Sequence, residues 1–527
     1  MPTRRALLAT PLIWANAFPA LADTPRDTVV MAKRIDDLIS LDPQESFEYS
    51  GSEICGNVYD KLVNPDDEDP TRINPMLAEQ WSASEDGRTW TFRLRGDRRF
   101  ASGAPVTAED AAWSLQRAVI LNKSPGFIIG QFGFTRDNVA ARIRATDNRT
   151  LVIEIAERQA PTFLLYCLSA SVGGVVEKRA ALSHAVGGDL GNAWLRTNSA
   201  GSGPWVVRSA RASEVVALDA NPSHPQPPRA KRMVIRHVPD PAVQLLLLQR
   251  GDADIARDLL PEGVRAARAD PRLEVLSEPK ASLVLLSMNT QHPALAKPAV
   301  WEAVRWAIDY RGIEANLVAD TYRAHQAFLP VGFPAAVTDM PYRYDPARAR
   351  ALLAGAGLPD GIDLTFDHAS SSPRAEIAQA LQAQMREAGI RLTLQAGEGR
   401  QVLTKMRARQ YQLAISLWGS DYLDPHSNAQ TFCVNADNSD ASTNRTSAWN
   451  CAWADADLTA RALAAAKEAD AGKRIAEYQA MQRDLMARGP FAIMLQEIGI
   501  AALRRPLSGF RQGPLSDRTS YAPIAKG

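Results

Sequence analysis

Hydrophobic and polar residues follow two different periods along this chain. Seven short segments are alternately or continuously apolar, which is typical of β-strands with one or both faces buried. They lie at 90–94, 151–155, 205–207, 283–288, 363–367, 391–395 and 412–418, and a further strand-like run begins near Thr28.

Helical patterns lie between these segments. We expect helices around Ile54–Leu62, from Thr107 onward, and at 241–250, 300–309, 346–356 and 374–388. Residues suited to helix ends support three of them: Thr107 with Asp110, Asp345 before Pro346, and Gly251. Because strands and helices mix from the outset, the pattern predicts an α/β protein.

Length and charge narrow the possibilities. A chain of 527 residues is too long for one hydrophobic core, so we expect several domains. The 60 basic and 59 acidic residues nearly balance, which gives no indication of a nucleic acid partner. The sequence has no apolar run of eighteen residues, so we expect no membrane span in the mature protein.

The N-terminus has the three parts of an export signal. The basic pair Arg4-Arg5 is followed by an apolar stretch at 6–18 and by Ala20-Leu21-Ala22. We predict a signal peptide at 1–22 and a mature protein located in the periplasm. An arginine pair here suits both the twin-arginine route and general secretion, and the route stays open.

Four cysteines remain in the mature part. Cys433 and Cys451 bracket a segment that is rich in Asn, Ser, Thr and Asp and has few apolar side chains to hold it folded. In an oxidising compartment a disulfide would stabilise such a segment by roughly 3 kcal/mol. We predict this disulfide over the alternative of two free buried thiols. Cys55 and Cys167 lie in apolar contexts and are left unpaired.

The sequence shows no pattern of catalytic residues. Its seven histidines are scattered, and it has neither a His-Glu-x-x-His motif, nor paired cysteines at zinc spacing, nor a Gly-x-Ser-x-Gly turn. The turn Gly201–Pro204 lacks the Lys-Ser/Thr of a phosphate-binding loop. We therefore expect neither an enzyme nor a cofactor.

A longer pattern begins at Pro75–Trp81 and continues through Ser84–Gly87 and Phe92–Arg95. One further match, Tyr59–Val63, lies before this stretch. The others follow it in order at 100–110, 201–204, 251–255, 288–290, 304–309 and 345–349. Together these residues resemble the peptide-binding class of periplasmic binding proteins, solute-binding protein family 5. That class includes oligopeptide, dipeptide, murein-peptide, glutathione and nickel-chelate binders.

The resemblance implies a two-lobed α/β fold, the large type II periplasmic binding protein fold, with an extra α/β domain inserted into lobe one. The expected parts are 23–65, 199–286 and 490–527 for lobe one, 66–198 for the inserted domain, and 287–489 for lobe two. The chain would cross between the lobes near Met288–Thr290 and near Pro490, and these crossings would be the hinge.

The resemblance also implies where a ligand binds. The strand ending at Trp418 leads into Gly419, Ser420 and Asp421. Asp421 is expected to pair with the α-ammonium of a peptide, and bonding to backbone amides in a turn is the alternative. Asp424 precedes Pro425, so we predict helix capping for it.

Other ligand contacts are expected from both lobes. Backbone groups of Leu417–Gly419 and of the loop Tyr49–Glu53, which includes Ser52, would clamp an extended peptide. Gly419 would allow close approach of the backbone, and Trp418 would either wall off a ligand side chain or pack in the core. Arg374 would hold the ligand's carboxylate or be a solvated helical arginine.

The expected function is capture of short peptides and their delivery to two permease subunits of an ABC importer and the associated ATPases. Three alternatives keep the fold and change the solute to a metal chelate, an opine or a glutathione-like metabolite that bears an amine. His426, close behind Asp421, is the signal for the metal chelate. The polar segment 433–451 would line a pocket or form a surface loop.

Overall fold

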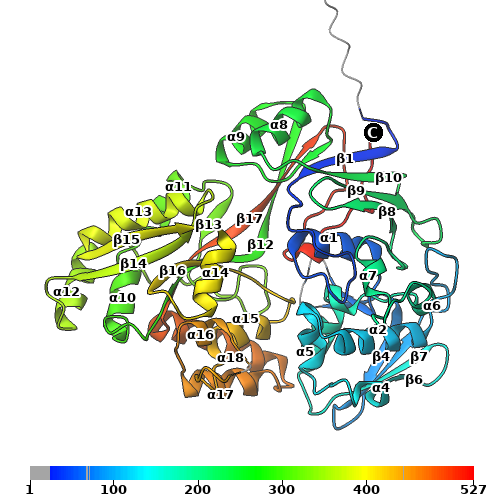
Figure 1. The fold of residues 1–527 in the computed structure, drawn as a ribbon, viewed down its shortest axis with the longest axis horizontal. Coiled ribbons are helices and arrows are strands. Elements are labelled where there is room, and N and C mark those ends of the chain that lie inside the picture. Colours follow the sequence, from blue (N-terminus) through cyan, green and yellow to red (C-terminus); the bar gives the residue numbers. More distant parts are fainter. Residues whose placement is uncertain (1–23, 67–68, 70–71, 443) are drawn as a thin grey trace, which may run out of the picture.

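The computed structural model describes residues 24–66, 69, 72–442 and 444–527. The predicted signal peptide lies outside the described residues. The chain forms two halves with a hollow between them, and Figure 1 shows α10 to α18 in one half and α1 to α7 in the other. Among the described residues, no helix combines the length and apolar character needed to cross a membrane.

One large sheet of eleven strands runs through both halves. From one edge to the other its strands are β15 (Ile390–Gly397), β14 (Ile362–Ala369), β16 (Leu413–Gly419), β12 (Leu273–Met288), β17 (Phe491–Arg504), β11 (Ile255–Ala256), β1 (Thr28–Lys33), β10 (Arg232–His237), β9 (Val215–Ala220) and β8 (Trp205–Arg211), while β13 (Tyr322–Ala324) pairs with β17. The pairs β14–β15, β14–β16, β1–β10 and β1–β11 are parallel, and the remaining pairs are antiparallel.

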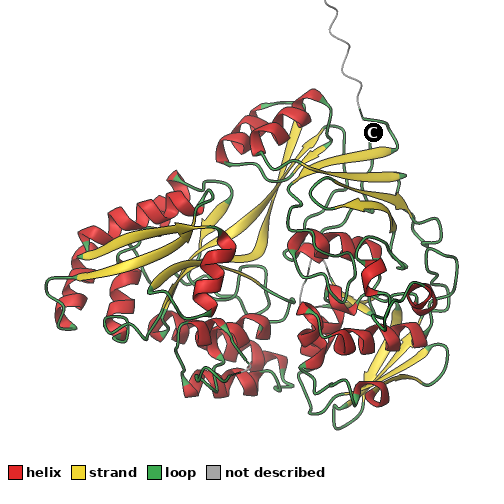
Figure 2. Cartoon of the chain, in the orientation of Figure 1, coloured by secondary structure: helices red, strands yellow, loops and turns green. Residues whose placement is uncertain are grey.

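Two long antiparallel strands, β12 and β17, connect the halves (Figure 2). Their pairing shifts register between Pro279 and Leu283. Residues 280–282 therefore bulge opposite Glu497, which β12 leaves unpaired. Bulges of this kind bend a strand and re-aim its side chains. The sequence predicted only the segment 283–288, because the first half of β12 carries exposed Glu274 and Glu278.

A second sheet of four strands lies within residues 78–154. Its order is β4 (Ala78–Ala83), β5 (Thr89–Leu94), β7 (Thr150–Glu154) and β6 (Ile143–Ala145), and a small pair β2 (Val63–Pro65) and β3 (Ile73–Pro75) precedes it. The helices of this half are α1 (Tyr49–Val58), α2 (Ala108–Leu121), α3 (Phe127–Gly130), α4 (Val139–Arg142), α5 (Pro161–Ser169), α6 (Lys178–Ser183) and α7 (Asn192–Leu195).

The remaining helices flank the large sheet. They are α8 (Pro241–Arg250), α9 (Pro261–Ala269), α10 (Pro298–Trp306), α11 (Tyr310–Asn316), α12 (Pro346–Gly355), α13 (Arg374–Glu387), α14 (Gly399–Arg407), α15 (His426–Cys433), α16 (Ser447–Asn450), α17 (Ala456–Ala465) and α18 (Ala471–Arg488). Three short 3-10 turns lie at Ser124–Gly126, Ser171–Gly173 and Ser516–Arg518.

Three large hydrophobic clusters form the cores. The first contains Tyr166 and buried residues from Ala281 to Leu495. The second contains residues between Leu62 and Val175 together with Tyr422 and Ala466. The third contains residues from Val29 to Ile255 and from Ala501 to Ile524. Strand β17 passes from one core to another: Leu495 packs in the first cluster, whereas Ile498 packs against a smaller cluster that contains Leu248 and Ile500. The predicted domain limits stay predictions.

The helix ends follow the local sequence. Thr107 accepts a hydrogen bond from the Asp110 amide, and the Asp110 side chain accepts one from the Thr107 amide, which confirms the capping box. Asp345 caps α12 through the Arg348 amide. Helix α8 ends at Gly251, whose φ of 87° lies in the left-handed region that glycine adopts without strain.

The predicted disulfide between Cys433 and Cys451 is wrong. All four cysteines are free and buried. Cys433 ends α15 inside the first cluster, and Cys451 lies beside the Tyr411 hydroxyl, with 3.3 Å between Sγ and the hydroxyl oxygen. Burial raises the pKa of the Cys451 thiol to about 12.

Polar side chains hold this segment in place of a disulfide. Asn435 and Asn438 donate to the carbonyls of Trp453 and Ala452, each at 2.8 Å. The guanidinium of Arg409 donates to the Trp449 carbonyl at 2.8 Å and stacks on the Trp449 ring at 3.6 Å. The asparagines that suggested a poorly held segment are the groups that hold it.

Candidate functional site

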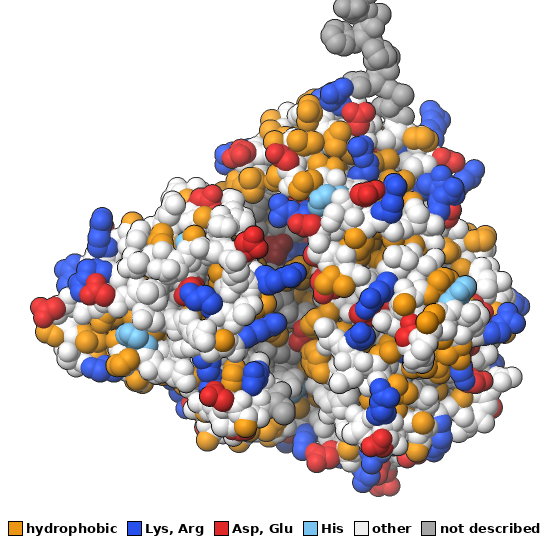
Figure 3. All heavy atoms as spheres, viewed as in Figure 1, with side chains coloured by type: hydrophobic (Ala, Val, Ile, Leu, Met, Phe, Trp, Pro, Cys, Tyr) orange, Lys and Arg blue, Asp and Glu red, His pale blue; other side chains and the backbone are white. Residues whose placement is uncertain are grey.

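A cavity of about 660 Å³ lies between the two halves. Its walls come from α1 and the loop before it, from the bulge of β12, from β17, from residues 170–172, and from the loop after β16. Figure 3 shows acidic and basic side chains along the hollow between the halves. The volume is typical of sites for small ligands.

Asp421 lies in the wall of this cavity with an unpaired carboxylate. Its backbone amide donates to the Ser427 hydroxyl at 3.0 Å, but its carboxylate has no hydrogen bond or ion pair with any described residue. Burial raises the pKa of Asp421 to about 7. A carboxylate in this state gains most from a cationic partner that enters the cavity.

Asp424, only three residues further on, is fully paired. Arg474 donates to its two carboxylate oxygens at 2.7 and 2.8 Å, and Asp424 also accepts from the His426 amide at 2.8 Å. The N-cap position of α15 is Pro425, so Asp424 lies one residue before the predicted capping position, although it accepts from the first amide of the helix. Asp424 is completely buried, so its partners are structural and it is closed to a ligand.

Gly419 brings the two halves into contact across the cavity. A Cβ atom at this position would lie 2.5 Å from the hydroxyl oxygen of Tyr49, the first residue of α1. The Tyr49 side chain is 56% exposed. A larger residue at position 419 would therefore have to displace the Tyr49 hydroxyl.

Trp418 and Leu417 differ in position. The indole of Trp418 lines the cavity, donates to Asn428 at 3.0 Å and meets the Phe432 ring edge to face at 6.0 Å. Trp418 therefore packs against the core and also lines the cavity, while its contact with a ligand stays a prediction. The Leu417 side chain is 42% exposed and does not line this cavity.

Arg374 lines the cavity at the first turn of α13. Its guanidinium donates to the Ser371 hydroxyl at 3.3 Å and has no ion pair with any described residue. Ser52 also lines the cavity, from α1. Arg374 is thus a cation that remains available to an acidic group of a ligand.

Glu53 lines the same cavity but is paired on all sides. Its carboxylate accepts from Lys33 at 2.6 Å, from Arg257 at 2.8 Å and from the Tyr521 hydroxyl at 2.6 Å. Burial alone would raise the pKa of Glu53, but the charges of Arg257 and Lys33 hold it well below its usual value. The predicted contact of Glu53 with a ligand would have to displace these partners.

Several cavity residues escaped the sequence-based prediction. Lys280 and Ser282 arrive from the bulge of β12, and Glu497 arrives from β17. Burial and the nearby charge of Arg257 lower the pKa of Lys280 to about 8, and its ammonium donates to the Gly513 carbonyl at 2.7 Å. The sequence contained one indication of this, because Glu497 is a charged residue within an otherwise largely apolar strand.

His426 lies away from any arrangement that would hold a metal. It is buried, its ring packs on the Phe163 ring at 4.9 Å, and its Nδ1 is 3.3 Å from the Tyr478 hydroxyl. Burial lowers the pKa of His426 to about 4. The described residues contain no group of three or more potential metal-ligating side chains.

The halves also touch on the side opposite the connecting strands. The Phe163 ring lies 5.8 Å from the Tyr422 ring, Arg474 donates to the Thr162 hydroxyl at 3.1 Å, and the Ala160 amide donates to the Ala466 carbonyl at 2.9 Å. These contacts close one end of the hollow, so the conformation brings both walls toward a ligand.

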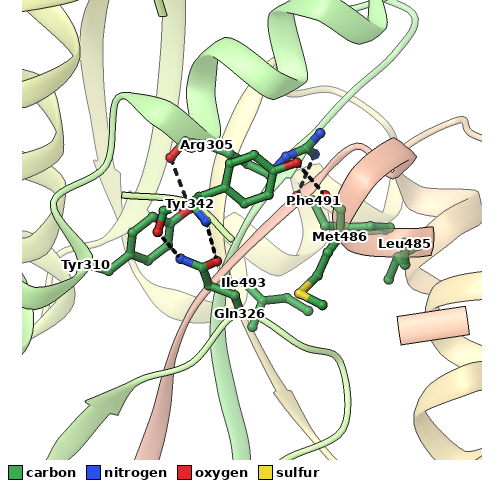
Figure 4. Close-up of a pocket in the computed structure, with 8 residues that line it drawn as sticks. All are labelled: Arg305, Tyr310, Gln326, Tyr342, Leu485, Met486, Phe491 and Ile493. Atoms are coloured by element: carbon green, nitrogen blue, oxygen red, sulfur yellow. Dashed lines mark hydrogen bonds between the residues drawn. The ribbon is translucent and has the colours of Figure 1, made fainter. Parts of the chain in front are cut away.

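A second cavity, beside Gln326 and Tyr342, has a volume of only about 10 Å³. Figure 4 shows that its polar groups bond to one another: Gln326 and Tyr342 exchange two hydrogen bonds, and the Tyr342 hydroxyl donates to the Met486 carbonyl. A space of this size holds one water molecule at most. It is a packing feature of the core.

Relatives share the whole architecture. Residues 72–440 match the family model described as bacterial extracellular solute-binding proteins, family 5. The chain is 27% identical over 523 residues to the probable D,D-dipeptide-binding periplasmic protein DdpA of Escherichia coli. This match covers 98% of this chain and 97% of that protein. It is also 27% identical to di/tripeptide-binding protein 2 of Pseudomonas aeruginosa, over 85% of each chain.

A solved structure confirms the predicted two-lobed fold. The periplasmic binding protein DppA of Helicobacter pylori, in complex with the peptide STSA, superimposes with a TM-score of 0.80 at 21% identity. The match covers 95% of this chain and 98% of that chain.

Proposed function

This chain belongs to the bacterial extracellular solute-binding proteins of family 5, and on that premise we propose that it captures short peptides in the cavity between its lobes. It binds the solute reversibly and performs no chemistry on it. Relatives whose names denote dipeptide and di/tripeptide binding support a peptide ligand, since they match 85% or more of this chain.

The observation that carries the proposal is the unpaired carboxylate of Asp421 in a cavity of about 660 Å³. A buried carboxylate without a partner is unfavourable, and the α-ammonium of a peptide relieves this by donating charge-assisted hydrogen bonds. Arg374 provides an unpaired cation in the same cavity for the peptide's carboxylate. A peptide with both ends free matches this pair of charges.

Closure of the lobes completes the site. Tyr49 and Ser52 of α1 face Gly419 and Asp421 of the other lobe, and β12 and β17 connect the two. A ligand between these walls would be removed from bulk water, which strengthens its ionic contacts. We place the protein in the periplasm, where its closed form would deliver the peptide to two permease subunits and their ATPases.

The experiment is a thermal-shift titration of the mature protein with Ala-Ala, Ala-Ala-Ala, N-acetyl-Ala-Ala, an opine, glutathione and nickel–histidine. A ligand that binds the native state raises Tm as its concentration increases. We expect the free peptides to raise Tm, N-acetylation to remove most of the effect, and Asp421→Asn to remove the response to the free peptides.

The matched control is Asp437→Asn, an exposed aspartate of the same lobe outside the cavity. This variant should respond to peptides as the wild type does. A rise in Tm only with nickel–histidine, or with solutes that lack an amine, would overturn the peptide assignment.

A further inference from the structure

Glu497 is another carboxylate of the cavity that has no ion pair with a described residue; Asp36, Asp37 and Asp258 share this property. Glu497 stands on β17, the strand that connects the lobes, and it lines both the 660 Å³ cavity and an adjoining cavity of about 460 Å³. Asp37 and Asp258 accept hydrogen bonds from backbone amides, whereas the Glu497 carboxylate has no hydrogen bond with any described residue. Its side chain is partly buried.

The neighbouring residue shows how fully this strand can satisfy a polar side chain. The amide of Gln496 donates to the carbonyls of Lys280 and Val331, both at 2.9 Å, and accepts from the Val331 amide at 3.0 Å and from Arg323 at 2.9 Å. One residue further on, Glu497 has none of these partners. The difference follows from the strand, whose alternate residues point to opposite faces.

The backbone explains why Glu497 faces the cavity. On one side it pairs with Tyr322 of β13, and on the other side residues 280–282 of β12 bulge away from it. The ladder is thus interrupted beside Glu497, whose side chain lines the space between the lobes.

The charges assigned to the two ends of a peptide lie in the same cavity as Glu497. Asp421, Arg374 and Glu497 all line the cavity of about 660 Å³. A ligand held at Asp421 and Arg374 therefore shares this space with the Glu497 carboxylate.

We propose that Glu497 binds a second cationic group of the ligand, so that the cavity selects short peptides with a basic side chain. This inference rests on the proposed function, because the ammonium at Asp421 and the carboxylate at Arg374 set the position of the peptide. The side-chain ammonium of lysine then pairs with Glu497 in the same cavity. A neutral peptide would leave Glu497 unpaired.

Nearby cations do not satisfy Glu497 already. Lys280 lines both cavities but directs its ammonium to the Gly513 carbonyl at 2.7 Å. Arg257 is engaged with Glu53 at 2.8 Å. The Arg374 guanidinium bonds only to Ser371 among the described residues. A ligand cation can thus pair with Glu497 without breaking an ion pair of the protein.

The test is isothermal titration with two matched pairs of dipeptides, Ala-Lys with Ala-norleucine and Lys-Ala with norleucine-Ala. Each pair differs only in the terminal charge of one side chain. We expect the lysine peptide of at least one pair to bind about tenfold tighter or better, as a charged hydrogen bond predicts. In Glu497→Gln this preference should disappear, while the norleucine peptides should bind as they do to the wild type.

Glu278→Gln is the matched control, since Glu278 is exposed on the neighbouring strand and lies outside both cavities. It should keep the preference for lysine. Equal binding of lysine and norleucine peptides by the wild type, or an unchanged preference in Glu497→Gln, would overturn the inference and leave peptide capture intact. If none of the four peptides binds the wild type, the proposed function itself fails.

Discussion

Two carboxylates on opposite walls of the cavity have opposite surroundings. On the lobe-one wall, Glu53 is surrounded by Lys33, Arg257 and the Tyr521 hydroxyl, all within 2.8 Å. On the lobe-two wall, Asp421 has a raised pKa of about 7 and no side-chain partner among the described residues. The Glu53 carboxylate is stabilised within the protein, whereas the Asp421 carboxylate would gain its ion pair only from a bound ligand.

The same contrast separates two aspartates of one loop. Asp424 is completely buried and holds Arg474 through two hydrogen bonds, while Asp421 faces the cavity. Sequence position alone does not distinguish them. We propose that a carboxylate of this loop is structural where the folded chain provides its counter-ion, as for Asp424, and binds a ligand where it does not, as for Asp421.

The largest effect should come from Glu53→Gln. Removing this charge leaves Lys33 and Arg257 buried without a counter-ion, and breaking a buried ion pair costs about 3–5 kcal/mol. Urea denaturation should show a loss of this size in the free energy of unfolding. A loss below about 1 kcal/mol would mean that Glu53 is not a structural carboxylate and would remove one side of the comparison.

Asp421→Asn should have the opposite sign. The folded protein raises the pKa of Asp421 to about 7 from an ordinary value of 3.8, so its stability falls as pH rises from about 4 to 7. Replacing the ionised group at pH 8 should therefore increase the free energy of unfolding of the ligand-free protein. We expect about 1–3 kcal/mol, since the side chain keeps some contact with solvent. Destabilisation would contradict the account.

Peptide affinity should depend on pH through the same group. Only ionised Asp421 pairs with an ammonium, so affinity for Ala-Ala should fall about eightfold between pH 7.5 and pH 6.0 as the carboxylate takes up a proton. Above pH 8 the peptide's own amine loses its proton and affinity should fall again. Titrations of Asp421→Asn should show no acid limb, and an acid limb that persists would assign it to another group.

The smallest effect should come from the cysteines. Because Cys433 and Cys451 are free, a reducing agent should leave Tm unchanged. Cys433→Ala combined with Cys451→Ala should cost about 1–2 kcal/mol, as expected for small buried side chains. A large drop in Tm under reducing conditions would indicate that a disulfide forms after all.

Local patterns predicted the parts of the fold that local interactions determine. The helix at 241–250 was predicted at its observed limits, because Asp240 and Pro241 at its start and Gly251 at its end are typical of helix termini. The Asp421 loop was placed at the ligand site by the family resemblance, and the structure shows it lining the cavity. The disulfide prediction failed because composition does not show which carbonyls Asn435 and Asn438 will reach.

Other features depend on contacts between distant segments. Glu497 and Lys280 meet the cavity through the pairing of β17 with β12, across more than two hundred residues of sequence. The partners that occupy Glu53 come from residues 33, 257 and 521. That Glu497 has no ion-pair partner among the described residues and that Glu53 has several could therefore not be predicted before these segments were placed side by side.

The most direct test of the central claim is a double-mutant cycle on the Asp421–ammonium contact. Isothermal titration would compare Ala-Ala with propionyl-alanine, which replaces the amine by hydrogen, in the wild type and in Asp421→Asn. If Asp421 anchors the ammonium, the two changes should be coupled by at least about 2 kcal/mol. Changes that add within about 0.5 kcal/mol would show that the amine and Asp421 act independently, and the account of this site would be wrong.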